Sequence, residues 1–217
     1  LNISSKTNLG QNLNINPEWN YHQFSQSVPV NNYNVFEPYI LEQKKHNQNQ
    51  ITTNLKKFQP TSGSTSARKW IPYSEDILKE FDKSIGPWLF DMYKNYPEIL
   101  QGKHYWSLSW IPDNLKKEMH QNDDLNYFPW YKRLFMQQVM ATPSDIANSK
   151  SSIASQMATL TYLVKTKNLS VIFIWSPTFF LNLLELLKDK KKEIVKILNT
   201  GNWNSLQNNL QSIKCPK

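Results

Sequence analysis

The sequence predicts an α/β protein in which helices and strands alternate and pack in layers. Residues 169–175, "LSVIFIW", are β-branched and aromatic with apolar side chains on both faces, which is typical of an interior, parallel strand. Residues 77–90 repeat apolar side chains at a helical period, which indicates a helix with one buried face. A hydrophobic content of 39% and an aromatic content of 13% in 217 residues indicate a globular domain with an ample core.

The N-terminal part is polar and irregular up to a pair of short strands. Residues 1–23 are rich in asparagine and are expected to form a loosely packed lead-in. Residues 24–40 mix apolar groups with prolines, which predicts a short extended piece followed by a helical turn. Residues 41–56 are polar enough for an exposed loop. We expect strands at "KFQP" (57–60) and at "KWIPY" (69–73), the second broken by a proline.

A long helix is expected after the second strand. Ser74 can cap its first turn, where Glu75 and Asp76 are favoured by the helix dipole. Gly86 and Pro87 should bend or interrupt the helix.

The C-terminal half is expected to continue the alternation. Its predicted elements are strands at 104–110 and 169–175 and helices at 130–140, 151–166 and 176–198, with a polar loop at 111–130. Ser176 fits the N-cap of the last helix and Pro177 its first position.

The net charge of +8 is not accompanied by the residues that read nucleic acids. Only Arg68 and Arg133 are arginines, and the guanidinium fork is the group that binds phosphates and guanine edges in two places at once. The lysines occur with many asparagines and isoleucines, as an AT-rich genome would produce. We therefore expect no nucleic-acid partner.

Metal sites, disulfides and membrane spans also lack support. The four histidines have no metal-ligand spacing, and Cys215 has no second cysteine to pair with. Its ordinary interpretation is an incidental residue and not a nucleophile. The apolar stretch 169–187 is interrupted by Ser176 and Pro177, which mark a strand-to-helix corner. Since residues 1–20 contain no signal peptide either, the expected location is the cytoplasm, with no membrane partner.

Residues 61–74, "TSGSTSARKWIPYS", have the composition of a phosphate-binding loop. Small residues let the backbone approach phosphates closely, main-chain N–H groups and hydroxyls can donate hydrogen bonds, and Arg68 or Lys69 can supply positive charge. The spacing G-x-x-x-x-G-K-[ST] is missing, so this is not a Walker loop. A loop of this composition can also be a solvated turn.

Five blocks together resemble the auxin-responsive Gretchen Hagen family of acyl acid–amido synthetases, in the adenylate-forming superfamily. They are "VPVNNYNVFEPYI", "TSGSTSARKWIPYS", "IGPWLFDMY", "GKHYWSLSW" and "LSVIFIWSPTFFLNLLELL". Their order and spacing are most similar to the bacterial branch of the family. The resemblance covers about residues 24–210. It implies that residues 24–217 are the N-terminal part of the large adenylation domain, an incomplete layered sheet-and-helix domain, with the C-terminal part and the small domain beyond them.

The resemblance implies an ATP-dependent ligase with two steps. A carboxylic acid becomes an acyl-adenylate, and an amine or amino acid then displaces AMP to form an amide. ATP and magnesium are the implied cofactors. The residues implied to bind the ATP phosphates are Ser62, Gly63, Ser64, Thr65 and Ser66, with Arg68 and Lys69 beside them. Those implied to line the acyl pocket are Met157, Thr161, Trp175 and Ser176, for which ordinary core packing is the alternative.

Two departures from the family pattern leave a second function open. Ser66 and Ala67 stand where the family usually has a glycine, and a Cβ restricts close backbone approach to phosphate. The family's motifs for the metal-binding acid and the ribose-binding aspartate match nothing in this chain, so we expect the chain alone to be inactive and assign it no catalytic or metal-binding residue. The alternative is a non-catalytic, truncated or degenerate module that binds a nucleotide or an acyl group. The sequence does not identify the acid, the amine or the oligomeric state.

Overall fold

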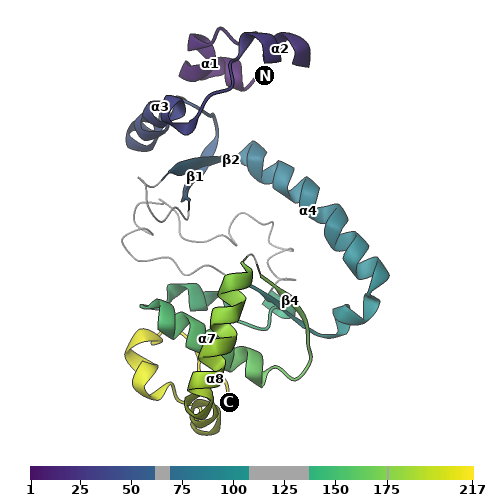
Figure 1. Ribbon diagram of the computed structural model, residues 1–217, viewed down its shortest axis with the longest axis vertical. Coiled ribbons are helices and arrows are strands. Elements are labelled where there is room, and N and C mark those ends of the chain that lie inside the picture. Colours follow the sequence, from purple (N-terminus) through teal and green to yellow (C-terminus); the bar gives the residue numbers. More distant parts are fainter. Residues whose placement is uncertain (62–68, 108–136, 175) are drawn as a thin grey trace. The chain divides into compact units, whose positions relative to one another are not determined.

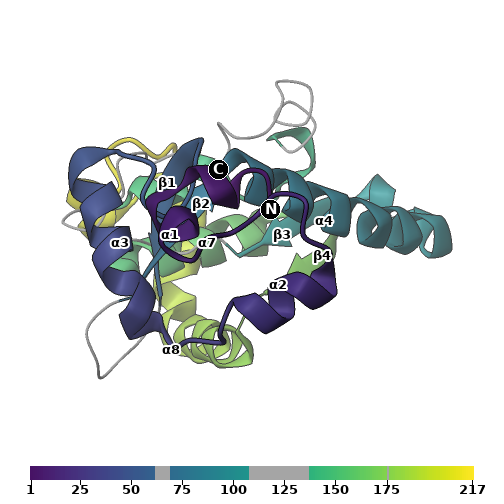
Figure 2. The same ribbon diagram turned by 90° about the horizontal axis from the view of Figure 1, so that it is seen from above.

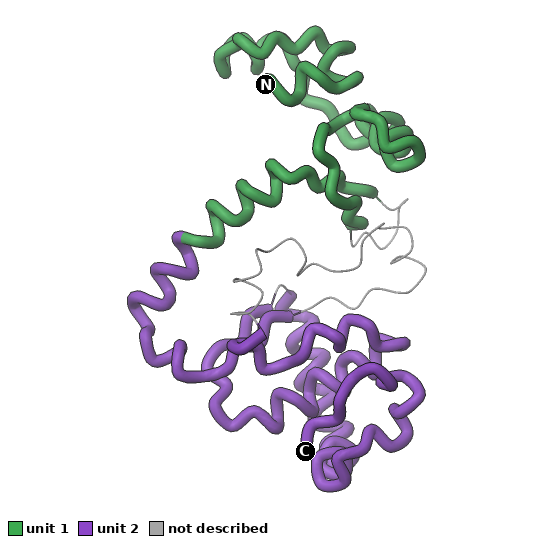
Figure 3. Tube along the Cα trace, turned by 180° about the vertical axis from the view of Figure 1, so that it is seen from behind, with its two compact units in different colours: residues 1–86, 117–122 green, residues 87–116, 123–217 purple. Residues whose placement is uncertain are grey.

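The computed structural model describes residues 1–61, 69–107, 137–174 and 176–217 (Figure 1). These residues mix helices with two small sheets, which confirms the predicted α/β class. They form two compact units, which Figure 3 colours separately: among the described residues, unit 1 contains residues 1–86 and unit 2 the residues from 87 onward. No helix in the described ranges is long and apolar enough to cross a membrane.

Unit 1 begins with more helix than the sequence suggested. The short helices η1 (Ser4–Lys6) and α1 (Asn8–Asn12) lie within the expected lead-in. They are followed by α2 (Tyr21–Ser27) and α3 (Tyr33–His46). The short extended piece and helical turn predicted over 24–40 correspond to residues 28–32 and the start of α3, although α2 occupies residues 24–27. The loop predicted from residue 41 is wrong as far as residue 46, because α3 continues to His46.

Helix α3 forms despite an internal proline because both of its ends are capped. The Asn32 side chain accepts a hydrogen bond from the backbone N–H of Asn34 at the first turn. Asn47 takes the left-handed conformation, with φ of 52°, at the last turn. Pro38 removes one backbone donor from the second turn, which a helix with satisfied ends tolerates.

The two strands predicted around the serine-rich loop are present and pair with each other. β1 (Leu55–Pro60) and β2 (Trp70–Ser74) run antiparallel, with Pro60 opposite Trp70 at the end next to the loop. Buried Phe58 and Trp70 anchor this hairpin. Residues 62–68 of the loop lie outside the described residues.

Helix α4 (Glu75–Asn95) follows β2 directly, as predicted. Gly86 and Pro87 do not interrupt it, and Figures 1 and 2 show one continuous ribbon. The division between the two units nevertheless falls between these two residues. Glu75 pairs with Lys79 at 3.0 Å and with Lys56 at 3.4 Å, and hydrogen bonds and charge from these lysines, Lys79 first, lower the pKa of its carboxyl.

The apolar face of α4 is not buried, contrary to the prediction. None of the helix residues is buried, and Phe81 and Phe90 are 47% and 69% exposed. Periodicity specifies an amphipathic helix, but burial also needs a surface packed against it. Among the described residues that surface is partial: Tyr73 stacks on Phe81 with ring centroids 5.9 Å apart, and Trp88 packs on two aromatic rings of unit 2.

Ser74 caps α4 as predicted, since its hydroxyl accepts a hydrogen bond from the Ile77 N–H at 3.3 Å. We expect Ser74→Ala to lower the free energy of unfolding of unit 1 by about 1 kcal/mol, because the Ile77 N–H loses the hydroxyl that accepts its hydrogen bond. Urea unfolding followed by circular dichroism measures this loss. Ser84→Ala, at an exposed hydroxyl in the middle of α4, is the control. Equal effects of the two substitutions would count against the cap.

Unit 2 is built on a pair of parallel strands. β3 (Lys103–Trp106) and β4 (Leu169–Phe173) align His104 with Val171 and Trp106 with Phe173. The parallel direction predicted for β4 is confirmed, but the predicted interior position is not, because none of its residues is buried and Ile172 is 45% exposed. β3 also forms an isolated bridge from His104 to Met140, and the short helix η2 (Pro97–Gln101) precedes it. The helix predicted at 130–140 lies mostly outside the described residues.

Two predicted helices supply the core of unit 2. α7 (Ser152–Lys165) packs against α8 (Pro177–Thr200), and buried Leu183, Ile194 and Ile197 of α8 face it. The short helices η4 (Ser144–Asn148) and η5 (Asn204–Asn209) flank this pair in the sequence. Buried Trp203, Leu210 and Ile213 bring the C-terminal segment onto the same core.

Candidate functional site

The predicted phosphate loop connects the two strands of a paired hairpin. At the loop end, the Thr61 N–H donates a hydrogen bond to the Lys69 carbonyl at 2.9 Å, which extends the pairing by one residue beyond β2. The two ends of the loop are therefore held next to each other. Of the seven residues predicted to bind phosphate, the structure describes Lys69; Ser62, Gly63, Ser64, Thr65, Ser66 and Arg68 lie outside the described residues.

Helix α3 contacts the second strand at the same end of the hairpin. Tyr33, the first residue of α3, accepts a hydrogen bond from the Trp70 N–H at 2.8 Å through its hydroxyl. The same hydroxyl donates to the Trp70 carbonyl at 3.4 Å. The Lys44 ammonium lies 3.2 Å from the centroid of the Trp70 ring. Sequence reasoning missed Tyr33 and Lys44, because nothing in the spacing shows which helix packs on the loop end.

The Lys69 side chain fits the binding of an anion. It is exposed, and among the described residues no carboxylate forms an ion pair with it. Its ammonium lies 5.4 Å from the centroid of the Tyr33 ring, an attractive cation–π distance. A lysine neutralised by a carboxylate would attract phosphate much less, and within the described ranges no carboxylate neutralises Lys69 in this way.

Two of the predicted acyl-pocket residues lie in the core of unit 2. Met157 is 1% exposed and Thr161 is 0% exposed, and the Thr161 hydroxyl donates to the Met157 carbonyl at 2.7 Å within α7. This is the arrangement of ordinary core packing. Ser176 is exposed and caps α8 by accepting a hydrogen bond from the Phe179 N–H. Trp175 lies outside the described residues.

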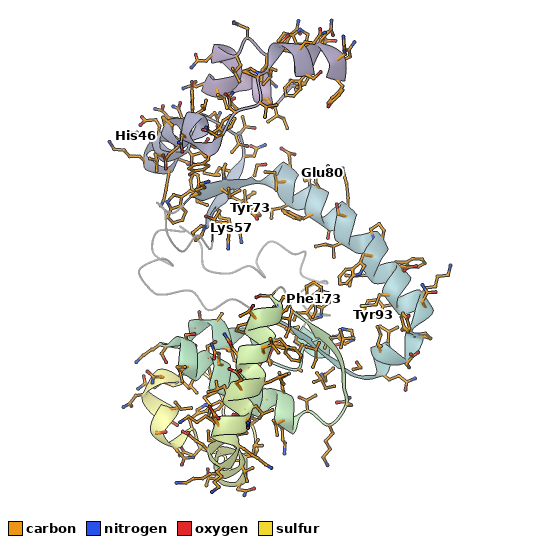
Figure 4. All side chains as sticks on the ribbon, viewed as in Figure 1. His46, Lys57, Tyr73, Glu80, Tyr93 and Phe173 are labelled. Carbon is orange, nitrogen blue, oxygen red and sulfur yellow. The ribbon has the colours of Figure 1, made fainter. Side chains whose placement is uncertain are left out.

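An aromatic cluster of Trp88, Trp106 and Phe173 gathers at the carboxyl edge of the parallel strands. Trp106 ends β3 and Phe173, labelled in Figure 4, ends β4; their ring centroids are 4.8 Å apart. The Trp88 ring of α4 lies 5.9 Å from the Trp106 ring and 5.3 Å from the Phe173 ring, measured between centroids, and Trp88 is 42% exposed. Ligands of parallel sheets bind beyond the carboxyl ends of the strands. The sequence analysis did not identify this cluster: the strands predicted at 104–110 and 169–175 contain Trp106 and Phe173, but were expected to end at Trp110 and Trp175.

His104 and Cys215, two titratable residues of unit 2, do not have the surroundings of catalytic groups. His104 is fully buried, with ring nitrogens 3.4 Å from the Tyr93 hydroxyl and 3.0 Å from the Ile99 carbonyl. Burial raises the pKa of the Cys215 thiol, which opposes the thiolate that a nucleophile needs. Among the described residues, no three histidine, cysteine or acidic side chains are grouped to hold a metal ion.

Comparison with known families supplies the identity of the domain. The family model described as the GH3 family N-terminal domain matches residues 1–215. The chain belongs to the GH3 family. The match confirms the resemblance to the Gretchen Hagen family, and it includes residues 1–23, which the resemblance had left out. No curated protein matches the chain. As a GH3 N-terminal domain, the chain carries its serine-rich loop on an antiparallel hairpin and its aromatic cluster on a parallel strand pair.

Proposed function

We propose that this GH3 domain contributes the phosphate-binding and acyl-binding surfaces of an ATP-dependent acid–amido synthetase. In the first step, a carboxylate oxygen of the acid attacks the α-phosphorus of ATP and pyrophosphate leaves. In the second, an amine or amino acid nitrogen attacks the acyl carbon and AMP leaves with the bonding electrons. Membership of the GH3 family supports the proposal, and the exposed Lys69 at the end of the hairpin is the observation that carries it.

The phosphate-binding role belongs to the hairpin end of unit 1. Lys69 would donate hydrogen bonds to phosphate oxygens and compensate their charge, and Arg68 would add a second cation. The residues from Ser62 to Ser66 would donate from hydroxyls and backbone N–H groups. Positive charge held in place near the leaving pyrophosphate lowers the barrier of the first step, because charge accumulates there in the transition state. Magnesium would accompany ATP.

The acyl-binding role belongs to the aromatic cluster of unit 2. Trp88, Trp106 and Phe173 offer flat apolar surface at the strand ends, and Trp175 and Ser176 follow Phe173 in the chain. Such a surface favours an acid with an aromatic or bulky apolar body. Met157 and Thr161 would support this surface from the core without touching the acid. Cytoplasmic location and membership of the bacterial branch stay predictions.

Titration of the 217-residue chain with ATP and magnesium tests the phosphate-binding role. We expect saturable binding in a calorimeter. Lys69→Ala should weaken it about tenfold or more, because a charge-assisted hydrogen bond and a local positive charge are lost.

Lys83→Ala is the matched control. This substitution also removes one positive charge from unit 1, but Lys83 is paired with Glu80 at 2.7 Å on the exposed side of α4. It should leave ATP affinity nearly unchanged. If both substitutions weakened binding equally, the effect would be one of net charge and not of a site. If the folded chain did not bind ATP at all, the alternative of a degenerate module with Ser66 and Ala67 in the loop would be favoured.

A further inference from the structure

We propose that Tyr33 is a positioning residue for phosphate binding, which holds the Lys69–Trp70 peptide group and thereby directs the Lys69 ammonium. This inference rests on the phosphate-binding role proposed above. It adds a residue of helix α3 that lies outside the serine-rich loop, 36 positions before Lys69 in the chain.

The peptide group that joins Lys69 to Trp70 is held from both sides. Its carbonyl, from Lys69, accepts a hydrogen bond from the Thr61 N–H at 2.9 Å, toward β1. Its N–H, from Trp70, points the opposite way in an extended chain and donates to the Tyr33 hydroxyl at 2.8 Å. With both polar groups of this peptide bound, its plane cannot rotate without losing a hydrogen bond. The direction in which the Lys69 side chain leaves the backbone is thereby fixed.

One hydroxyl serves two groups on the open edge of β2. The N–H and the carbonyl of Trp70 point to the same side of the strand, and the Tyr33 hydroxyl accepts from the first and donates to the second at 3.4 Å. β1 occupies the other edge, so Tyr33 takes the place of a neighbouring strand at this residue. Trp70, which follows the last residue predicted to bind phosphate, is therefore held from both edges of the strand.

The aromatic ring of Tyr33 acts on Lys69 directly. The Lys69 ammonium lies 5.4 Å from the ring centroid, so the ring attracts the ammonium without neutralising its charge. Two contacts keep α3, and with it Tyr33, in place. Asn32 caps the first turn of α3, and Lys44, near the other end of the helix, lies over the Trp70 ring.

This arrangement has a consequence for affinity. A free lysine side chain loses much rotational entropy when it binds phosphate, and a side chain that is already restricted loses less. Tyr33 would contribute to ATP affinity through Lys69 and not by touching ATP. That distinction can be measured, because the contribution should disappear when Lys69 is absent.

The test is a double-mutant cycle on the 217-residue chain, with the affinity for ATP and magnesium as the readout. Tyr33→Phe, which keeps the ring and removes the hydroxyl, should weaken ATP binding about three- to tenfold when Lys69 is present. In the Lys69→Ala background the same substitution should change the affinity less than about twofold.

Tyr39→Phe controls for the loss of a tyrosine hydroxyl from α3. The Tyr39 hydroxyl accepts from the Asn12 side chain at 2.9 Å and has no contact with β2 among the described hydrogen bonds. Thermal unfolding of both variants, measured in parallel, separates lost stability from lost affinity. An unchanged affinity in Tyr33→Phe, or an equal loss with and without Lys69, would overturn the positioning role while leaving the phosphate site in place. Absence of ATP binding by the parent chain would instead reject the proposed phosphate site, and the role of Tyr33 with it.

Discussion

Replacing Trp203 with alanine should destabilise unit 2 by about 3–5 kcal/mol, the range for removing a buried large aromatic side chain. Trp203 is 1% exposed and belongs to the core that α7 and α8 enclose. Its ring lies 6.4 Å from that of Tyr162 on α7, measured between centroids. The cavity left by alanine could close only if the segment after α8 moved.

The indole N–H of Trp203 adds a second cost. It donates a hydrogen bond to the Ile213 carbonyl at 2.7 Å, inside the core. Trp203→Phe should keep most of the apolar contact but leave that carbonyl without its partner, so its loss of stability should be smaller than that of alanine and still exceed about 1 kcal/mol. Together the two substitutions separate packing from hydrogen bonding.

Urea unfolding combined with hydrogen exchange of α7 and α8 measures both variants. Hydrogen exchange of α7 and α8 reports on the stability of unit 2 alone, so a loss of stability in unit 1 would not affect this measurement. Leu181→Ala is the control, since this α8 residue is 59% exposed and should cost little. A Trp203→Ala protein as stable as the Leu181→Ala protein would show that the C-terminal segment contributes nothing to the core.

The elements that could be predicted are those with a local signal. Ser176 and Pro177 mark the start of α8 by residue type alone, and Ser74 marks the start of α4. The run of β-branched and aromatic residues at 169–175 predicted a parallel strand, which β4 confirms. Each of these signals depends on residues within a few positions of one another, so one sequence suffices to read them.

The features that could not be predicted depend on contacts between distant residues. Only a helical turn was expected where α3 begins, and its full length was missed, because Pro38 and the polar residues after it argued against a longer helix. The exposed face of α4 was misjudged because periodicity does not say what packs on it. The contact of Tyr33 with Trp70 joins residues 37 positions apart, and no local pattern encodes it. The serine-rich loop was recognisable from composition, whereas the group that holds its end was not.

Strongly alkaline pH should unfold unit 2 in part through Tyr105. This residue of β3 is 2% exposed, and burial raises its pKa from 10.0 to about 12, although a hydrogen bond with Thr159 acts in the opposite direction. Because the folded state keeps the phenolic proton longer than the unfolded state, the unfolded state binds fewer protons above pH 10. Stability from this residue is therefore fully present below about pH 10 and is lost between about pH 10 and 12, by about 2–3 kcal/mol.

Tyr105→Phe should consequently have opposite effects at the two ends of this range. Near pH 8 the variant loses the hydrogen bond with Thr159 and should be less stable than the parent by about 1 kcal/mol. Near pH 12 the parent must keep a neutral phenol buried while its unfolded chain ionises, and phenylalanine carries no such cost, so the variant should be the more stable protein. If the free energy of unfolding is measured at intervals from about pH 8 to about pH 12, the curves of the parent and of Tyr105→Phe should cross. Tyr96→Phe, at a side chain that is 59% exposed, should run parallel to the parent. Burial also raises the pKa of Tyr93 and Tyr162, so both proteins should lose stability in base, and the crossing alone reports on Tyr105.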